Sequence, residues 1–335
     1  MGEKEAPSPS VDRLADIPLA EWQLVAEKAG DRLTGHIRHC TRNAFDHLRR
    51  AWRLHDIDNQ MSAFRAITAE EEAATALILA LKRQLYPGAD RLNPRNHVHK
   101  SALWPLISAL GGLFYDLKIP GPQIVISGEG PPRVTLRINM TKLAGHDGEP
   151  VWMEPDHPLN FEIRTGPISD KVVHLFEEEL AAIASNAGDQ SIRVYVERQA
   201  NQRNRLLYAS DKGLPDISFT DNMLLARAHR VSILAILTVI VLQTPQHQQL
   251  VLQCLEALLR ALDAIGSTIF DYGEEVERAG FLIDRTGPGP GRISFSRPFE
   301  AQVRWEYNAP GWSWPPSQMP APKDQIDGQD APSPF

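Results

Sequence analysis

The sequence predicts an α+β protein, mainly α-helical, in which a helical bundle is interrupted by a β-rich segment. Three observations lead to this class. Apolar residues recur every three or four positions over several long segments, as they do on one face of a helix. The pattern stops at Lys118, and the helix breakers Pro120 to Pro122 follow it. Short segments with alternating apolar residues come next, and helical patterning resumes near Asp170.

Composition limits the classes of function. A chain of 335 residues can form one large domain or two ordinary ones, and its net charge of −7 argues against a generally basic binder of nucleic acid or membrane surfaces. Cys40 and Cys254 are too few and too far apart for a disulfide framework, so we expect buried thiols in a reducing compartment. Residues 1–10 lack the apolar stretch of a secretory signal. The apolar run from Val231 to Leu242 is roughly half the length that spans a bilayer. We therefore expect a cytoplasmic protein without a membrane segment.

The first half of the bundle is expected at residues 19–118, after a flexible tail at 1–18. Its predicted helices cover 19–29, 35–55, 60–85 and 94–113. The segment Asp56–Asn59 supplies the turn and capping residues before the third helix. Asn93-Pro94 opens the fourth helix, because proline suits a first helical turn, and we expect a bend at Pro105.

The β-rich insertion is expected at residues 119–168, and the second half of the bundle at 169–270. The predicted strands of the insertion cover 123–127, 133–139, 151–154 and 160–164. The predicted helices of the second half cover 170–187, 191–209, 220–243 and 246–265. Strands at 281–284, 292–296 and 302–306 give a C-terminal β segment at 271–310. The Pro-rich residues 311–335 are expected to be disordered, apart from Trp312 and Trp314. Whether the two β segments share a sheet stays open.

An acidic residue interrupts the apolar face of the 60–85 helix. Because successive helical residues lie about 100° apart, Glu70 falls near the middle of the apolar side. Glu71 falls near the edge of that side, and Glu72 falls on the opposite, solvent-facing side. A core carboxylate needs a basic or hydrogen-bonding partner, since desolvation costs several kcal/mol. We therefore expect Glu70 to form a structural ion pair between two helices or to be a functional carboxylate; the remaining alternative is that the predicted helix is misplaced.

Histidines on the next helix are candidate partners of this carboxylate. His99 lies on the apolar side of the 94–113 helix and completes a predicted buried polar site with Glu70 and Glu71, whereas His97 and Lys100 project elsewhere. The two histidines lie about 160° apart on a helix and so cannot chelate one metal ion there, although they could in a strand. A second histidine pair, at positions 36 and 39, lacks a third ligand with suitable spacing. We expect neither a metal nor a cofactor.

Arginines gather in two parts of the sequence. The first group is Arg32, Arg38, Arg42, Arg49, Arg50 and Arg53, set against Asp46, and the second group is Arg193, Arg198, Arg203 and Arg205. Such groups can bind phosphates by charge and by bidentate hydrogen bonds. Arg49, Arg50, Arg53, Arg203 and Arg205 are the predicted binding residues for RNA or a partner protein. The alternative is a solvated surface that the excess of acidic residues neutralises.

Several segments resemble a known family. The stretch Asn43-Ala-Phe-Asp-His-Leu-Arg-Arg-Ala-Trp-Arg-Leu-His55, followed by Ala63-Phe-Arg-Ala-Ile-Thr-Ala-Glu-Glu71, resembles the HEPN superfamily. More narrowly, the chain is similar to AbiV-type abortive-infection proteins, which carry a Glu-Glu pair on their second helix. His97-Val-His-Lys100 and Arg205-Leu-Leu-Tyr-Ala-Ser-Asp211 are similar to later segments of that family. The match covers about 43–110 and 200–240.

The resemblance implies an activity. HEPN ribonucleases cleave RNA without a metal, with a histidine that handles protons and an arginine that steadies the phosphate, often across a homodimer. The pairs Arg42/His47 and Arg91/His97 match this arginine–histidine pattern. We therefore expect a protein of phage defence or of a toxin-like stress response that acts on RNA or on a partner protein. One alternative is a non-catalytic helical interaction module. Another is a small-molecule enzyme with Glu70 as general base, which requires an open pocket at that residue.

Overall fold

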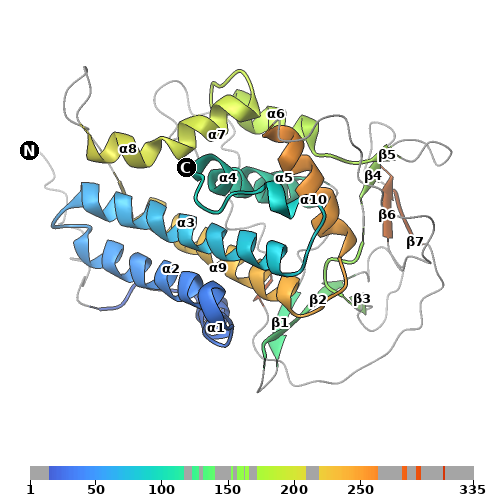
Figure 1. The fold of residues 1–335 in the computed structure, drawn as a ribbon, viewed down its shortest axis with the longest axis horizontal. Coiled ribbons are helices and arrows are strands. Elements are labelled where there is room, and N and C mark those ends of the chain that lie inside the picture. Colours follow the sequence, from blue (N-terminus) through green and yellow to red (C-terminus); the bar gives the residue numbers. More distant parts are fainter. Residues whose placement is uncertain are drawn as a thin grey trace, which may run out of the picture.

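The described part of the chain is mainly helical (Figure 1). The computed structural model describes residues 15–116, 123–127, 131–139, 152–153, 157–161, 163–165, 172–208, 219–262, 281–284, 292–295 and 312–313. Its α-helices are α1 (Glu21–Asp31), α2 (Gly35–Leu54), α3 (Asn59–Arg83), α4 (His97–Ser101), α5 (Leu103–Asp116), α6 (Glu177–Asn186), α7 (Ile192–Ala200), α8 (Gln202–Leu207), α9 (Asp221–Leu242) and α10 (Gln249–Ala261). One turn of 3-10 helix, η1 (Ala89–Arg91), precedes α4.

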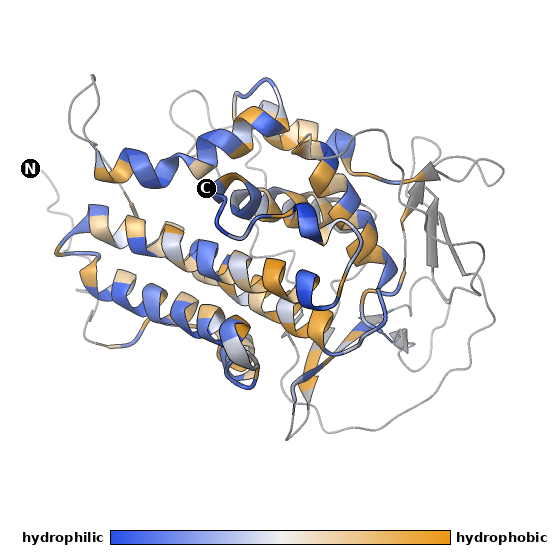
Figure 2. Ribbon diagram, viewed as in Figure 1, coloured by the Kyte–Doolittle hydropathy of each residue, from blue (hydrophilic) through white to orange (hydrophobic). Residues whose placement is uncertain are grey.

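The centre of the bundle is α3, which packs against both α2 and α9 (Figure 1). Its buried residues are mainly alanines, and they include Ala66, Ala69, Ala76 and Ala80. Short side chains let neighbouring helices approach closely, and alanine also has the highest helix propensity. Figure 2 shows apolar residues concentrated on α5, α9 and α10, while α7 and α8 are more hydrophilic. The core therefore lies along α3 and α9, and α8 covers one side of α3.

The long helices occur close to the predicted positions. This holds for α1, α2, α3, α9 and α10, whose spans follow the apolar periodicity. Asp58 caps α3, because its carboxylate accepts a hydrogen bond of 2.9 Å from the backbone N–H of Met61. Residues 1–14 of the predicted tail lie outside the described residues, whereas Ile17 is buried in the core.

Three predicted helices differ in the structure. The helix predicted at 94–113 is two helices, α4 and α5, which break at Ala102 instead of bending at Pro105. Proline is tolerated at this position because it lies in the first turn of α5, where no intrahelical N–H bond is needed. The helix predicted at 191–209 divides into α7 and α8 at Asn201. The helix predicted from Asp170 begins only at Glu177, after a short strand.

The strands of the described residues form three small antiparallel sheets. They are β1 (Gln123–Ser127), β2 (Arg133–Asn139), β3 (Trp152–Met153), β4 (Arg164–Thr165), β5 (Val172–Val173), β6 (Phe281–Asp284), β7 (Arg292–Phe295) and β8 (Trp312–Ser313). The largest sheet has the order β3-β2-β1-β8, while β4 pairs with β5 and β6 pairs with β7. The strand predicted at 160–164 is thus reduced to Arg164–Thr165, and the one predicted at 302–306 lies outside the described residues.

The end of the chain returns to the first sheet. Trp312 pairs with Ile124, and Ser313 pairs with Gln123, so β8 lies antiparallel to β1. The sequence exempted Trp312 from the predicted disorder after residue 310, and Trp312 lies in β8; the strand itself was not predicted. A two-residue strand at an edge has no periodicity of its own that a sequence could reveal.

Glutamine side chains attach the segments beside the strands to the helices. The Gln243 amide accepts a hydrogen bond of 2.8 Å from the Val134 N–H and donates one of 3.0 Å to the Val134 carbonyl. Gln253 pairs in the same way with the backbone of Ile163, and its amide also donates to the His174 carbonyl. Buried backbone groups must be paired, so these amides do what a neighbouring strand would do. They hold β2 against the C-terminal end of α9, and the residues beside β4 and β5 against α10.

The most apolar helix is α9. Among the described residues it is the one helix long and apolar enough to cross a membrane, with a mean hydropathy of 1.8 over its most apolar window. Of that window, 72% is buried inside the structure, as in the core helix of a bundle. Both described cysteines are free. Burial raises the pKa of each thiol to about 12, so neither is suited to act as a nucleophile.

Candidate functional site

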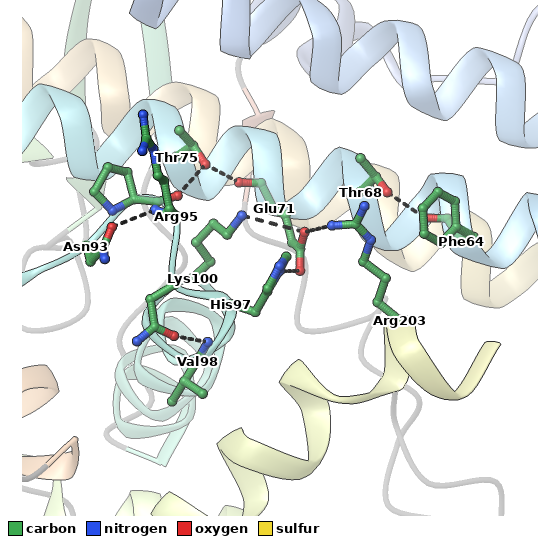
Figure 3. Close-up of polar contacts among 12 residues, drawn as sticks. Phe64, Thr68, Glu71, Thr75, Asn93, Arg95, His97, Val98, Lys100 and Arg203 are labelled. Atoms are coloured by element: carbon green, nitrogen blue, oxygen red, sulfur yellow. Dashed lines mark hydrogen bonds and ion pairs between the residues drawn. The ribbon is translucent and has the colours of Figure 1, made fainter. Parts of the chain in front are cut away.

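A buried carboxylate with three basic neighbours forms the candidate site (Figure 3). Glu71 lies on α3, and only 8% of its side chain is exposed. Its Oε1 lies 2.5 Å from Nδ1 of His97. Its Oε2 lies 3.6 Å from Nζ of Lys100 and 3.4 Å from Nη1 of Arg203. Figure 3 shows the carboxylate between two residues of α4 and one residue of α8.

Local structure positions each of these groups. The side chain of Asn96 accepts a hydrogen bond of 2.9 Å from the Val98 N–H and so caps α4. His97 is therefore the first residue of α4, and Lys100 lies one turn later on the same face. On α8, the guanidinium of Arg203 lies 4.8 Å from the centre of the Phe64 ring, a cation–π contact with α3. This contact holds α8 against the helix that carries the carboxylate.

The predicted role of His99 is wrong. Its Nδ1 accepts a hydrogen bond of 3.0 Å from the Asn93 N–H, and it contacts neither glutamate among the polar contacts of the described residues. Burial lowers the pKa of His99, and nearby Lys82 lowers it further. The sequence prediction treated residues 94–113 as one continuous helix and placed His99 on its inward face together with the apolar residues. Because the chain breaks at Ala102, the inward face of α5 does not continue into α4.

Glu70 has basic partners on α9. Its Oε2 contacts Nη1 of Arg227 and lies 3.5 Å from Nη1 of Arg230. Arg227 also donates a hydrogen bond of 3.2 Å to Oε1 of Gln202. Burial alone would raise the pKa of Glu70, but the charges of the two arginines outweigh it and lower the pKa. A core carboxylate thus has the ion pairs that it needs. A carboxylate with a lowered pKa is a weak general base, which argues against a small-molecule enzyme that uses Glu70 in this role.

A small pocket joins the two glutamates. It has an empty volume of about 420 Å³, including its open mouth. Its walls come from α3, α4, α5, α7, α8 and α9, and the lining residues are Ile67, Glu70, Glu71, Lys100, Ser101, Trp104, Pro105, Tyr195, Gln199, Gln202, Arg227 and Arg230. The guanidinium of Arg230 lies 4.9 Å from the centre of the Trp104 ring, so the indole forms a flat support for it. The pocket is therefore mostly polar and contains more cationic than anionic side chains.

Beside this pocket, His229 makes edge contacts with two indoles. Its ring centre lies 5.1 Å from that of Trp22 and 6.5 Å from that of Trp104. Burial, assisted by the charge of Arg230, lowers the pKa of His229 from 6.5 to about 4. Between pH 6.5 and about pH 4, His229 is therefore protonated in the unfolded chain but neutral in the folded chain. Because the unfolded state binds the extra proton, the free energy of unfolding decreases as the pH falls through this range.

The change His229→Gln is expected to remove this part of the pH dependence. From the pKa difference, the wild type should lose about 2 kcal/mol more of its free energy of unfolding between pH 7 and pH 5 than the variant. Glu70 does not interfere, because a carboxylate with a lowered pKa reduces stability only below its ordinary pKa of 4.5. Urea unfolding of both proteins at the two pH values measures the difference. An equal loss in the two proteins would contradict the assignment.

The structure does not bring the predicted Arg42/His47 pair together. Arg42 is exposed and lies 3.1 Å from Asp31 of α1. His47 faces α3 instead, where its Nδ1 lies 3.3 Å from Nη1 of Arg65. Burial lowers the pKa of His47, as does the Arg65 charge. The two residues lie five positions apart on one helix, so they project about 140° from each other. No polar contact in the described structure joins Arg91 to His97, the second predicted pair.

The predicted basic face of α2 is largely neutralised. Arg49 is not available to a phosphate, because it binds both carboxylate oxygens of Glu27 at 2.5 and 2.7 Å and Asp16 at 3.0 Å. These contacts raise the pKa of Arg49 further above its ordinary value. Arg50 pairs with Asp46 at 2.8 Å. The acidic neighbours come from α1, from the segment before it and from α2 itself, so the surface here is mixed in charge.

The second arginine group is divided between different roles. Arg198 binds Asp189 at 2.6 Å, and Arg203 belongs to the Glu71 cluster. Arg205 on α8 and Arg53 on α2 are exposed. Of the predicted binding residues, Arg50, Arg53 and Arg205 are exposed, and Arg50 pairs with Asp46.

Sequence reasoning missed Arg227, Arg230 and Trp104. The two arginines stand three residues apart inside the most apolar helix, and this unusual position was the available signal. Charged residues are seldom buried unless they are paired, so a search for acidic partners on other helices could have found them. Among the described residues, no group of three or more His, Cys, Asp or Glu side chains is placed to hold a metal ion.

Segments that carried the family resemblance meet at this site. Glu71 of α3 contacts His97 and Lys100 of α4 and Arg203 of α8, the helix in which the segment beginning at Arg205 starts, whereas Glu70 contacts α9. Comparisons of the chain with protein-family models, with curated proteins and with solved structures find no match. The resemblance to HEPN and AbiV-type proteins therefore stays a prediction.

Proposed function

We propose that this chain is an HEPN/AbiV-like protein of phage defence or of a stress response, and that it cleaves RNA without a metal at the Glu71 cluster. One observation carries the proposal. His97 is held by a buried carboxylate at 2.5 Å through Nδ1, yet 42% of its side chain is exposed. A histidine that a carboxylate orients and that solvent can reach is suited to proton transfer.

The expected chemistry follows from this arrangement. Glu71 accepts the Nδ1–H of the neutral ring, which leaves Nε2 free to act as base. Nε2 takes the proton of a ribose 2′-hydroxyl, and the 2′ oxygen attacks the adjacent phosphorus. The bond to the 5′ oxygen of the next nucleotide breaks, and that oxygen takes a proton from water or from the protonated ring. The products are a 2′,3′-cyclic phosphate and a 5′-hydroxyl.

Arg203 and Lys100 supply the positive charge for this reaction. Charge that develops on the phosphate is stabilised by donors that are already in place. Arg203 is about one-third exposed and lies beside His97 on the same carboxylate. In this proposal Arg203 therefore takes the arginine role for which the sequence suggested Arg42 and Arg91. Exposed Arg205 extends the positive surface along α8 for the rest of an RNA strand.

The proposal extends to the architecture and the setting. We take the helices as an HEPN-like bundle and the segment between α5 and α6 as a β-rich insertion in it. The protein would act in the cytoplasm, with RNA as its substrate, and a homodimer fits the family that it resembles.

The test is an RNA cleavage assay in EDTA. Purified protein is incubated with total RNA, and the products are examined for 2′,3′-cyclic phosphate ends. Cleavage in EDTA is expected for the wild type and also for His47→Ala, because His47 lies on the α2 side of α3 next to Arg65. Absence of wild-type cleavage over a range of pH and salt would contradict the proposal.

A non-catalytic interaction module is the second candidate. The exposed apolar side chains of Leu207 and Tyr208, next to Arg205 at the end of α8, favour it. Exposed large apolar groups beside a charge are common where partners bind. Binding of RNA or protein at α8 without any cleavage would favour this module.

A further inference from the structure

Three buried hydrogen-bond donors in the pocket have either a long ion pair or no hydrogen-bond partner. The Arg230 side chain is only 12% exposed, and its ion pair among the described residues is the 3.5 Å contact with Glu70. The Lys100 side chain is 10% exposed, and its ion pair is the 3.6 Å contact with Glu71. Charge-assisted hydrogen bonds are normally about 2.7–2.9 Å long. The Nε2 of Gln199 is buried and has no hydrogen-bond partner in the described structure. All three side chains line the same pocket.

The charge of the pocket also favours an anionic ligand. Lys100, Arg227 and Arg230 line it together with only two carboxylates, Glu70 and Glu71. Arg227 directs its donors to Glu70 and Gln202, so the cations with long ion pairs are the other two, Arg230 and Lys100. A buried charge whose ion pair is long and an unsatisfied buried amide both reduce the stability of a fold. An anion in the pocket would offset both effects.

We propose that this pocket binds one phosphate-sized anion, held by the Arg230 guanidinium, the Lys100 ammonium and the Gln199 amide. Ser101 and Tyr195, which both carry a hydroxyl group, also line the pocket. Burial raises the pKa of Tyr195, so its phenol stays a hydrogen-bond donor. Trp104 supports the guanidinium from behind, which fixes its donors in one direction. A planar fork and a mobile ammonium together match the tetrahedral oxygens of phosphate.

The pocket adjoins the cluster to which the RNA cleavage is assigned. Glu71 and Lys100 belong to both. The phosphate could therefore be free inorganic phosphate or the terminal phosphoryl group of an RNA. The second source rests on the proposed function, whereas the anion site itself does not.

Titration with inorganic phosphate tests the site. Isothermal calorimetry and thermal unfolding are carried out with full-length protein, against sodium chloride at equal ionic strength. The wild type is expected to bind phosphate saturably and to unfold at a higher temperature with it. Gln199→Leu and Lys100→Met should each weaken binding about tenfold or more, because each removes a hydrogen bond to a charged group. Arg83→Gln, at the exposed end of α3 and outside the pocket lining, is the matched control and should bind like the wild type.

The Gln199→Leu variant also reports on folding. Without phosphate it should unfold no earlier than the wild type, because it removes an unsatisfied buried amide. Absence of saturable binding to the wild type, or wild-type affinity in both pocket variants, would overturn the proposal. If one variant fails to fold, the other decides the outcome.

A competition experiment distinguishes the two sources. Oligoribonucleotides with 2′-O-methyl groups, which cannot be cleaved, compete with inorganic phosphate on the His97→Ala variant. One strand carries a 5′-phosphate and the other a 5′-hydroxyl. If only the 5′-phosphorylated strand competes, the ligand of the pocket is the terminal phosphoryl group of an RNA. If neither strand competes, the ligand is free phosphate. Equal competition by the 5′-hydroxyl strand would contradict a pocket for a single phosphate group. Because the His97→Ala variant is expected not to cleave RNA, phosphate binding by this variant tests the anion site independently of the cleavage proposal.

Discussion

Replacing Glu70 by alanine is expected to lower the free energy of unfolding by about 3–5 kcal/mol, the range for removal of one partner of a buried ion pair. Glu70 is the shared partner of Arg227 and Arg230, and all three side chains are nearly inaccessible to solvent. The change leaves two guanidinium groups in the core without a carboxylate. It also breaks the polar link between α3 and α9. Urea unfolding followed by circular dichroism measures the effect.

A surface ion pair provides the control for this change. Asp31 and Arg42 pair at 3.1 Å, but both side chains are largely exposed. Asp31→Ala should therefore change the free energy of unfolding by about 1 kcal/mol or less. A loss of similar small size for Glu70→Ala would show that the Glu70 pairs do not stabilise the bundle.

The second large effect is expected on catalysis. His97→Ala should reduce the rate of RNA cleavage in EDTA by about 10² to 10⁴, the range for loss of a general acid–base group. His99→Ala is the matched control, because it lies on the same short helix but contacts the Asn93 N–H instead of Glu71. It should cleave RNA at close to the wild-type rate. Single-turnover rates with one labelled RNA give the comparison.

Two outcomes would contradict this prediction. If both variants keep the wild-type rate, another group transfers the proton. If His99→Ala loses as much activity as His97→Ala, the effect comes from α4 as a whole. Thermal unfolding of each variant shows whether α4 is still packed against α3.

The sequence predicted the mainly helical fold because the long helices have clear apolar periodicity. It assigned the phase of α3 less well, and the reason is physical. A helical wheel assumes one inward face, whereas α3 lies between α9 on one side and α4 with α8 on the other. Glu70 and Glu71 therefore both point to neighbouring helices, and the residue placed at the edge of the apolar face is the more buried of the two.

The partners of the glutamates lie far away in the chain. Arg227 is 157 residues from Glu70, and Arg203 is 132 residues from Glu71. No local pattern specifies such pairs, because they depend on how α8 and α9 pack on α3. The choice between His97 and His99 failed for a local reason, since the break at Ala102 separates the inward faces of α4 and α5.

A double-mutant cycle on the rate of RNA cleavage tests most directly whether Glu71 and His97 act as one catalytic unit. The four proteins are the wild type, Glu71→Gln, His97→Ala and the double variant, all assayed in EDTA at single turnover. If the carboxylate works by orienting the ring, the double variant will cleave no more slowly than His97→Ala alone, because groups that act together are not additive. Multiplicative losses in the double variant, or no cleavage by the wild type, would contradict the account.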